Sequence, residues 1–274
     1  MKIKILLFAI IFLNLSCNSK SKDKSENNKT ENTKSLNSNK EIVKDFEKNY
    51  IGTINKKMNV VFYLRSVNGE INGYYFYQNK GIDIKLKGKL LNNKMVLDEF
   101  DFFDNKVAQI TLKENGKKVF GEWHNSKSSK ILKVDLQETE KKIVAFPKNI
   151  EGIYKTENSE NKIETCNLTL TITKKNGKYS YNYKSESRTL NGKVSFYRDI
   201  DEAYITLEGI KWAEYEGDVT NQDDENYEEK DLELPIGIEG SISENEILIQ
   251  NDGNNMNYYV KLNDCGVKYI HLKK

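Results

Sequence analysis

The sequence predicts an all-β protein: two tandem antiparallel meander β-barrels, or compact sandwiches, behind an export signal and a polar tether. Three observations support this fold class. From Tyr50 onward, apolar and polar residues alternate with a period of two, which is typical of half-buried strands. Asn-Gly pairs stand between the apolar runs and favour tight hairpins, because both central residues of a type I′ turn need positive φ. The connections are too short for the helical crossovers that parallel strands require.

The first β domain is expected to span residues 49–140. Its connections are short throughout, so the strands should form an antiparallel meander of about eight members. Alternation leaves one apolar face on each strand, and covering that face requires a second sheet or closure into a barrel. The apolar runs that predict strands are residues 60–64, 71–77, 82–86, 95–97, 107–112, 119–123 and 131–136.

A second β domain, residues 149–274, repeats the pattern of the first and follows a join that contains Pro147. An extra polar segment, residues 217–230, interrupts this copy. We interpret the two domains as copies of one module; the alternative is convergence on common strand and turn patterns. The matching pairs are Gly52-Thr53-Ile54 with Gly152-Ile153-Tyr154, Asn68-Gly69 with Asn176-Gly177, residues 86–89 with 190–193, and residues 120–123 with 238–241.

The first 17 residues have the features of an export signal. Lys2 and Lys4 precede an unbroken apolar run from residue 5 to residue 13. Such a run is less than half the length needed to cross a ~30 Å hydrocarbon core as a helix. The segment ends in Leu15-Ser16-Cys17, which resembles the lipobox of bacterial lipoproteins, although Asn14 stands where that motif usually has leucine. The resemblance implies that Cys17 is lipidated; the alternative is an ordinary cleaved signal peptide.

Residues 18–48 should form a flexible polar tether. Residues 18–40 contain one large apolar residue, Leu36, so burial cannot offset the entropy of ordering this segment. The last part, residues 41–48, has Ile42, Val43 and Phe46 at helical spacing and predicts a short helix. The tether would hold the β domains away from the membrane surface.

The two remaining cysteines, Cys166 and Cys265, are expected to form a disulfide, as pairs of cysteines in exported proteins commonly do. Cys166 is expected to open the first long strand of the second domain, and Cys265 to follow its penultimate strand. In a closed meander these strands lie side by side, so the bridge would fasten the closing seam. The alternative is two buried free thiols. This architecture resembles the small calycin barrels of lipocalins and avidins, a resemblance that implies no ligand by itself.

Composition and motifs argue against several classes of function. The chain has 43 Lys and Arg against 41 Asp and Glu, and two of the lysines belong to the signal, so nucleic acid is not an expected partner. His124 and His271 lack neighbours at metal-ligand spacing, and no motif indicates a cofactor. We therefore expect no metal, no cofactor and no enzymatic activity. A hydrolase using paired carboxylates is the alternative. The acidic run within residues 218–233 predicts a solvated loop, with calcium binding as its alternative.

Aromatic residues are the candidate contacts for a ligand or partner. The rings of residues 74–77 fall on both faces of one strand, so one pair must lie outside the core or form an edge. Exposed rings can stack on sugars or fill a protein interface, whereas the alternative is that they are core residues. The candidate contacts are Tyr75, Tyr77, Trp123 and Tyr181.

The sequence therefore predicts a lipoprotein of the bacterial cell envelope, anchored by its N-terminal lipid and expected at the outer membrane. The leading hypothesis is a non-catalytic binding module for a small ligand, a glycan or an envelope protein. The alternative is a periplasmic inhibitor or immunity-type lipoprotein that blocks a toxin or a lytic enzyme. A roomy apolar cavity would favour capture of a small ligand, and packed barrels with a projecting polar loop would favour inhibition.

Overall fold

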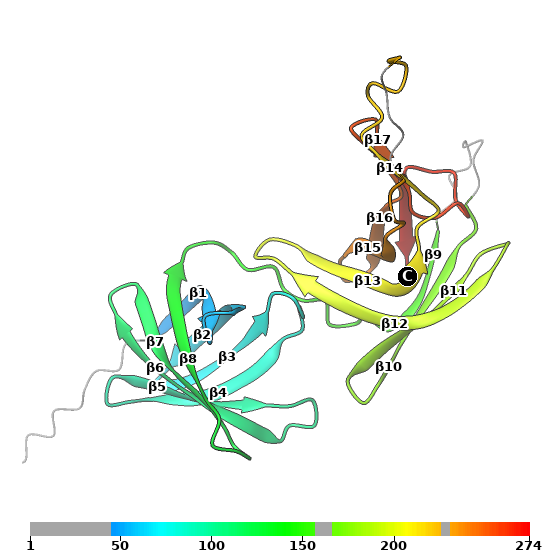
Figure 1. Cartoon of the computed structure of the whole chain (residues 1–274). Helices are drawn as coiled ribbons and strands as arrows, with labels where there is room; N and C mark the ends of the chain where they lie inside the picture. Colours follow the sequence, from blue (N-terminus) through cyan, green and yellow to red (C-terminus); the bar gives the residue numbers. More distant parts are fainter. Residues whose placement is uncertain (1–44, 157–165, 226–230) are drawn as a thin grey trace, which may run out of the picture. The chain divides into compact units, whose positions relative to one another are not determined.

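A computed structural model of the chain describes residues 45–156, 166–225 and 231–274, and every regular element in these ranges is a β-strand (Figure 1). The strands close into two eight-stranded antiparallel barrels, which confirms the predicted fold class and selects barrels over sandwiches. No helix in the described ranges is long and apolar enough to cross a membrane.

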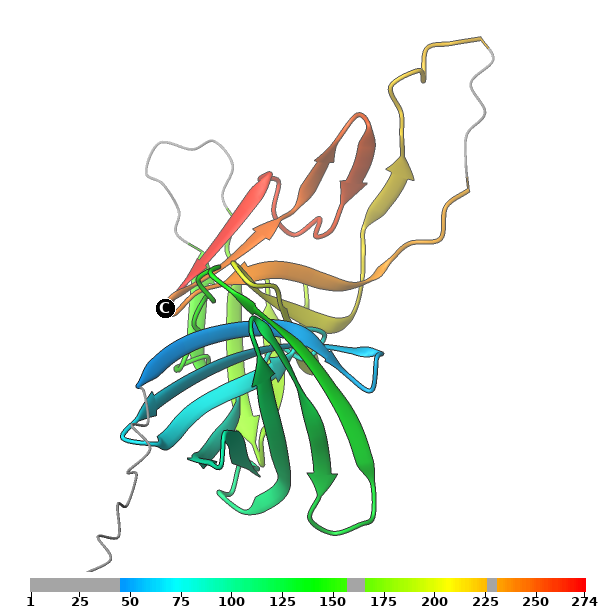
Figure 2. The same ribbon diagram turned by 90° about the vertical axis from the view of Figure 1, so that its left-hand side faces the viewer.

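The first barrel is a simple meander in which each strand pairs with the next along the chain. It closes where β1 pairs with β8, with Ile51 opposite Gln137. Figure 2 shows these strands, coloured blue to green, curving around one another. The strands are β1 (Phe46–Ile54), β2 (Met58–Val67), β3 (Glu70–Tyr77), β4 (Ile84–Leu91), β5 (Lys94–Phe100), β6 (Lys106–Asn115), β7 (Lys118–Asn125) and β8 (Ile131–Thr139).

Two of the predicted Asn-Gly hairpins have the expected backbone. Asn68 and Gly69 have φ values of 52° and 81°, and Asn176 and Gly177 have φ values of 50° and 76°. These are the two consecutive positive φ angles that a type I′ turn requires. The third pair differs, because Asn115 is still part of β6 and pairs with Lys118, so Gly116 occupies the first position of that turn.

The interior of the first barrel is filled by apolar side chains. Tyr50, Phe62 and Leu97 are each 0% exposed and belong to one continuous cluster to which all eight strands contribute. The interior of this barrel is therefore filled by its own side chains, as in other small barrels.

The second barrel follows the same antiparallel plan but carries an insertion. It closes where β19 pairs with β9, with Leu272 opposite Thr156. Its wall consists of β9 (Gly152–Thr156), β10 (Thr169–Lys175), β11 (Lys178–Lys184), β12 (Thr189–Arg198), β13 (Ala203–Lys211), β15 (Ile236–Ile242), β16 (Glu246–Gln250) and β19 (Tyr269–Lys273). Three further strands, β14 (Glu214–Gly217), β17 (Asp252–Asn254) and β18 (Asn257–Val260), form a separate small sheet outside this wall.

The predicted short helix before the first domain is wrong where the structure describes it. Strand β1 begins at Phe46, inside the segment assigned to the tether, and Phe46 lies opposite Ser66 on β2. The long β2 offers a hydrogen-bonding partner for these residues, and that pairing outweighs a helical spacing that rests on three apolar residues. Residues 41–44 lie outside the described ranges.

Three of the four matching segments fall on strands of equivalent position in the two barrels. Counting from each first strand, the Asn-Gly turns join the second and third strands in both. The fourth match fails: residues 120–123 lie on β7, the seventh strand, whereas residues 238–241 lie on β15, the sixth strand of its barrel. A Gly between strand residues is common enough to match by chance.

Candidate functional site

Tyr75, Tyr77 and Trp123 meet at one end of the first barrel. In an antiparallel meander the odd-numbered strands run in the same direction, so the C-terminal ends of β3, β5 and β7 gather at one end. Tyr75 and Tyr77 are two residues apart on β3 and therefore both face inward. Trp123 faces inward from β7 and packs against the same core.

A buried carboxylate, Glu99 on β5, connects these rings. Its Oε2 atom accepts hydrogen bonds from the Tyr75 hydroxyl at 2.8 Å and from the Trp123 indole nitrogen at 2.6 Å. The Tyr75 hydroxyl lies 3.5 Å from that of Tyr77, and their rings meet edge to face with centroids 5.5 Å apart. Glu99 is 8% exposed, and no described Lys or Arg forms a salt bridge with it. We call these four residues the Glu99 cluster.

The electrostatic environment keeps the two phenols protonated. Burial raises the pKa of Tyr75 far above its usual range, and the negative charge of Glu99 raises it further. Burial also raises the pKa of Tyr77 and outweighs the opposing effect of its contact with the Tyr75 hydroxyl. At neutral pH, Tyr75 therefore acts as a hydrogen-bond donor toward Glu99.

The Glu99 cluster has the groups needed to bind a cationic or hydrogen-bond-donating ligand. A carboxylate attracts ammonium groups, and aromatic faces add cation–π attraction. Tyr77 and Trp123 are partly exposed, whereas Tyr75 is fully buried, so the first two form the accessible rim.

The opposite end of the same barrel differs because its acids already have a cation. The Lys48 ammonium lies 2.9 Å from Glu114 and 3.0 Å from Glu138. Tyr50 donates a further hydrogen bond to Glu114 at 2.9 Å. The two ends of the barrel therefore differ in charge pairing: Glu114 and Glu138 share Lys48 at one end, whereas Glu99 at the other end has no charged partner among the described residues.

Tyr181, the fourth candidate contact, lies in the second barrel and does not join this cluster. It is 4% exposed, and its hydroxyl donates to the backbone carbonyl of Glu208 at 2.8 Å. Its ring covers Gly192 on the neighbouring strand, where an added Cβ would lie 2.6 Å from the ring. These contacts place Tyr181 in the apolar core of its barrel.

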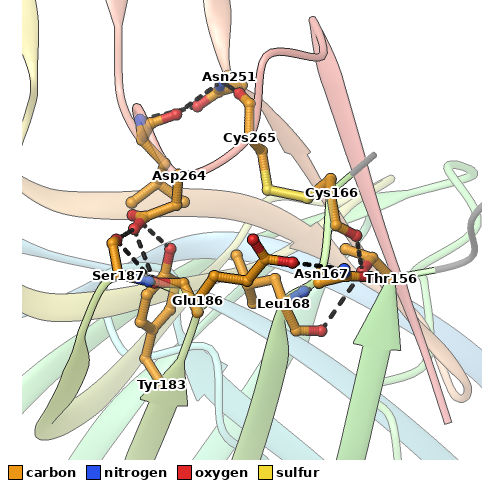
Figure 3. The surroundings of a disulfide bond; sticks show 12 residues. Thr156, Cys166, Asn167, Leu168, Tyr183, Glu186, Ser187, Asn251, Asp264 and Cys265 are labelled. Atoms are coloured by element: carbon orange, nitrogen blue, oxygen red, sulfur yellow. Dashed lines mark hydrogen bonds between the residues drawn. A yellow bond between two sulfur atoms is a disulfide. The ribbon is translucent and has the colours of Figure 1, made fainter. Parts of the chain in front are cut away.

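The second barrel is fastened by the predicted disulfide (Figure 3). Cys166 and Cys265 are joined, with Cα atoms 4.8 Å apart. Cys166 precedes β10 and Cys265 precedes β19, the two strands that flank β9, so the bridge spans the closing seam. Thr156 at the end of β9 donates its hydroxyl to the Cys166 carbonyl and accepts from the Leu168 amide at 3.0 Å.

Asp264, next to Cys265, accepts hydrogen bonds from the end of β11 and from the loop that follows it (Figure 3). Its carboxylate accepts from the Tyr183 hydroxyl at 2.7 Å, the Ser185 hydroxyl at 2.7 Å, the Ser187 hydroxyl, and the Arg188 guanidinium at 2.6 and 2.9 Å. Burial alone would raise the pKa of Asp264, but these donors outweigh it and lower the pKa to about 2. Because its oxygens are occupied by the protein, Asp264 is a structural group.

The remaining candidates lie on the surface. His124 contacts Glu122 at 3.0 Å, and His271 contacts Glu246 at 2.7 Å. The acidic run follows β14, and residues 226–230 of it lie outside the described ranges. Among the residues that the structure describes, no group of three His, Cys, Asp or Glu side chains could hold a metal ion. Cys17 also lies outside these ranges.

No family model, curated protein or solved structure matches this chain.

Proposed function

We propose that this chain is a non-catalytic binding lipoprotein of the bacterial cell envelope, and that the Glu99 cluster binds a small ligand carrying an ammonium group. One observation carries the proposal: three aromatic residues gather around a buried carboxylate that lacks a charged partner among the described residues. The filled barrel interior argues against capture of a large apolar ligand, and it leaves the barrel end as the place for recognition.

The chain contains a natural reporter for this test. Trp123 and Trp212 are its two tryptophans, so a Trp212→Phe variant leaves Trp123 as the single fluorophore. In that background we expect choline, ethanolamine or an amino sugar to change the emission of Trp123, because its indole nitrogen bonds to Glu99. Glu99→Gln removes the negative charge and should weaken binding at least tenfold, equivalent to about 1.4 kcal/mol.

Glu140→Gln is the matched control for this charge change, because the Glu140 side chain is 92% exposed and lies outside the cluster. It should bind as the parent does. A Trp123 signal that stays constant up to millimolar concentrations of all three amines contradicts the assignment, as does equal binding by the Glu99→Gln variant.

Lipid anchoring is tested separately from ligand binding. Cys17→Ser should move the protein from the membrane fraction to the soluble fraction, because several acyl chains on one cysteine hold firmly and their loss leaves no anchor. Ser21→Ala, a change in the predicted tether, should leave the protein in membranes. Membrane retention of the Cys17→Ser variant would contradict the lipoprotein assignment.

An inhibitor of a toxin or lytic enzyme is the second candidate function. The observation that favours it is the separate sheet of β14, β18 and β17, which lies outside the wall of the second barrel. The turn between β17 and β18 exposes Met256, whose side chain is 69% exposed. An apolar side chain at the tip of a polar projection suits insertion into a partner's cleft. Lysis of cell walls by lysozyme, measured with and without the full chain, distinguishes this candidate from an amine-binding protein.

A further inference from the structure

The outer wall of the first barrel contains a groove that is distinct from the Glu99 cluster. It has a volume of about 500 Å³ and lies over β5 to β8. Its floor includes Gly121, where the backbones of β6 and β7 approach so closely that an added Cβ would lie 1.8 Å from the carbonyl oxygen of Thr111. Glycine at such a position allows the wall of a barrel to bend sharply.

A row of four outward side chains crosses this groove. The strand register places Lys94 opposite Lys113, Lys113 opposite Phe120, and Phe120 opposite Asp135. Phe120 is 44% exposed. An aromatic ring of this size on an otherwise polar strand surface offers a flat face to a ligand.

The two lysines of this row, Lys94 and Lys113, do not contribute to the stability of the barrel in any evident way. Like charges directly opposite one another in an antiparallel pair are destabilising. Several other lysines of the barrel form ion pairs with acids, as Lys106 does with Asp98 at 2.6 Å and Lys89 with Glu70 at 2.9 Å. Neither Lys94 nor Lys113 forms a salt bridge with any residue that the structure describes.

We propose that this groove binds an acidic oligosaccharide, with one sugar ring stacked on Phe120 and the carboxylate of a uronic acid held between Lys94 and Lys113. Asp135, at the far end of the row, can accept hydrogen bonds from sugar hydroxyls. The groove volume of about 500 Å³ falls within the range of small-ligand sites, ~300–1,000 Å³.

The remaining charges of the groove set the class of ligand. Asp135 on β8 lies on the side of Phe120 away from the lysine pair, and Glu122 lies two residues further along β7, between Thr111 and Lys133. A polymer with a negative charge on every unit would meet these two carboxylates. A glycan in which acidic and neutral rings alternate can place a negative charge at the two lysines and sugar hydroxyl groups at the two carboxylates. This pattern favours such a glycan over nucleic acid.

The probe for this site is a hyaluronan tetrasaccharide, in which uronic acids and neutral N-acetylated amino sugars alternate, and fully N-acetylated chitotetraose is the neutral comparison. We expect calorimetry on the full chain to detect the acidic probe and to give at least tenfold weaker binding of the neutral one. Raising the salt concentration should weaken binding, because exposed charges are screened. The Lys94→Gln/Lys113→Gln variant should lose at least tenfold in affinity, and Phe120→Ser should lose a similar factor.

Lys87→Gln/Lys89→Gln is the matched control, because it removes two exposed lysines from β4 of the same barrel. It should bind the tetrasaccharide as the parent does. Equal loss in both double variants, equal affinity for fully N-acetylated chitotetraose, or no heat with the acidic probe would each overturn the proposal. Binding that survives in Glu99→Gln supports a site separate from the Glu99 cluster, and binding that is lost in Glu99→Gln assigns the probe to that cluster and overturns the groove.

Discussion

Replacement of Asp264 by alanine is expected to destabilise the second barrel by about 2–4 kcal/mol, because it leaves a buried phenol without its acceptor and a partly exposed guanidinium without its ion partner. The Asp264 side chain is 1% exposed, and it holds the guanidinium of Arg188 together with three hydroxyl groups. Without the carboxylate, the Tyr183 hydroxyl loses its acceptor in a buried position. Thermal or denaturant unfolding, followed by circular dichroism, measures the change.

The control for this prediction is Asp201→Ala, which removes an exposed carboxylate from a turn of the same barrel. It should change the free energy of unfolding by no more than about 0.5 kcal/mol, as is usual for surface substitutions. A midpoint for Asp264→Ala that matches that of Asp201→Ala would show that the cluster contributes nothing to stability.

The same carboxylate should make stability depend on pH in acid. The folded pKa of Asp264 is about 2, below the reference value of 3.8. A lowered folded pKa stabilises the folded state above the unfolded pKa, and that contribution is lost as pH falls through the folded value. The parent should therefore lose about 2 kcal/mol between pH 4 and pH 2 that Asp264→Asn does not lose. Parallel stability curves for the two proteins across this window would contradict the lowered pKa.

Most of the fold could be predicted because its signals are local. Alternation in a run such as 107–112 assigns each residue to a face, and Asn68-Gly69 supplies its own turn chemistry. The beginning of β1 could not be predicted in the same way. In a segment as short as 41–48, three apolar residues at helical spacing are too few to exclude a strand, and the pairing of Phe46 with Ser66 favours the strand.

The candidate site was predictable in part. Tyr75, Tyr77 and Trp123 stand out as aromatics on strands, but Glu99 is one of 41 acidic residues. Its one signal is its position: Met95, Leu97 and Glu99 share the inward face of β5, so a charged residue stands where an apolar one is expected. Asp264 has a weaker signal, its position beside Cys265, because its donors lie about 80 residues earlier, as the separation of 81 from Tyr183 shows.

Removal of the disulfide should also destabilise the second barrel strongly. The bridge between Cys166 and Cys265 closes a loop with a sequence separation of 99. Cross-linking a loop of this length restricts the unfolded chain, and loss of a native disulfide commonly costs about 2–5 kcal/mol. The Cys166→Ala/Cys265→Ala variant should therefore melt about 10 °C or more below the parent in a scan of the full chain.

Reduction provides the matched control for this variant, because it breaks the same disulfide bond without replacing any residue. A reducing agent should lower the midpoint of the parent toward that of Cys166→Ala/Cys265→Ala and should leave the variant unchanged.

The bridge spans the seam where β19 meets β9, which is held by two residue pairs, Leu272 with Thr156 and Lys273 with Lys155. We therefore expect the seam with few backbone pairs to depend on the covalent link. By contrast, β1 and β8 of the first barrel pair over six residues, from Asn49 to Ile54, without one. Equal midpoints for oxidised and reduced parent protein, with free thiols verified by mass spectrometry, would show that the seam holds without it.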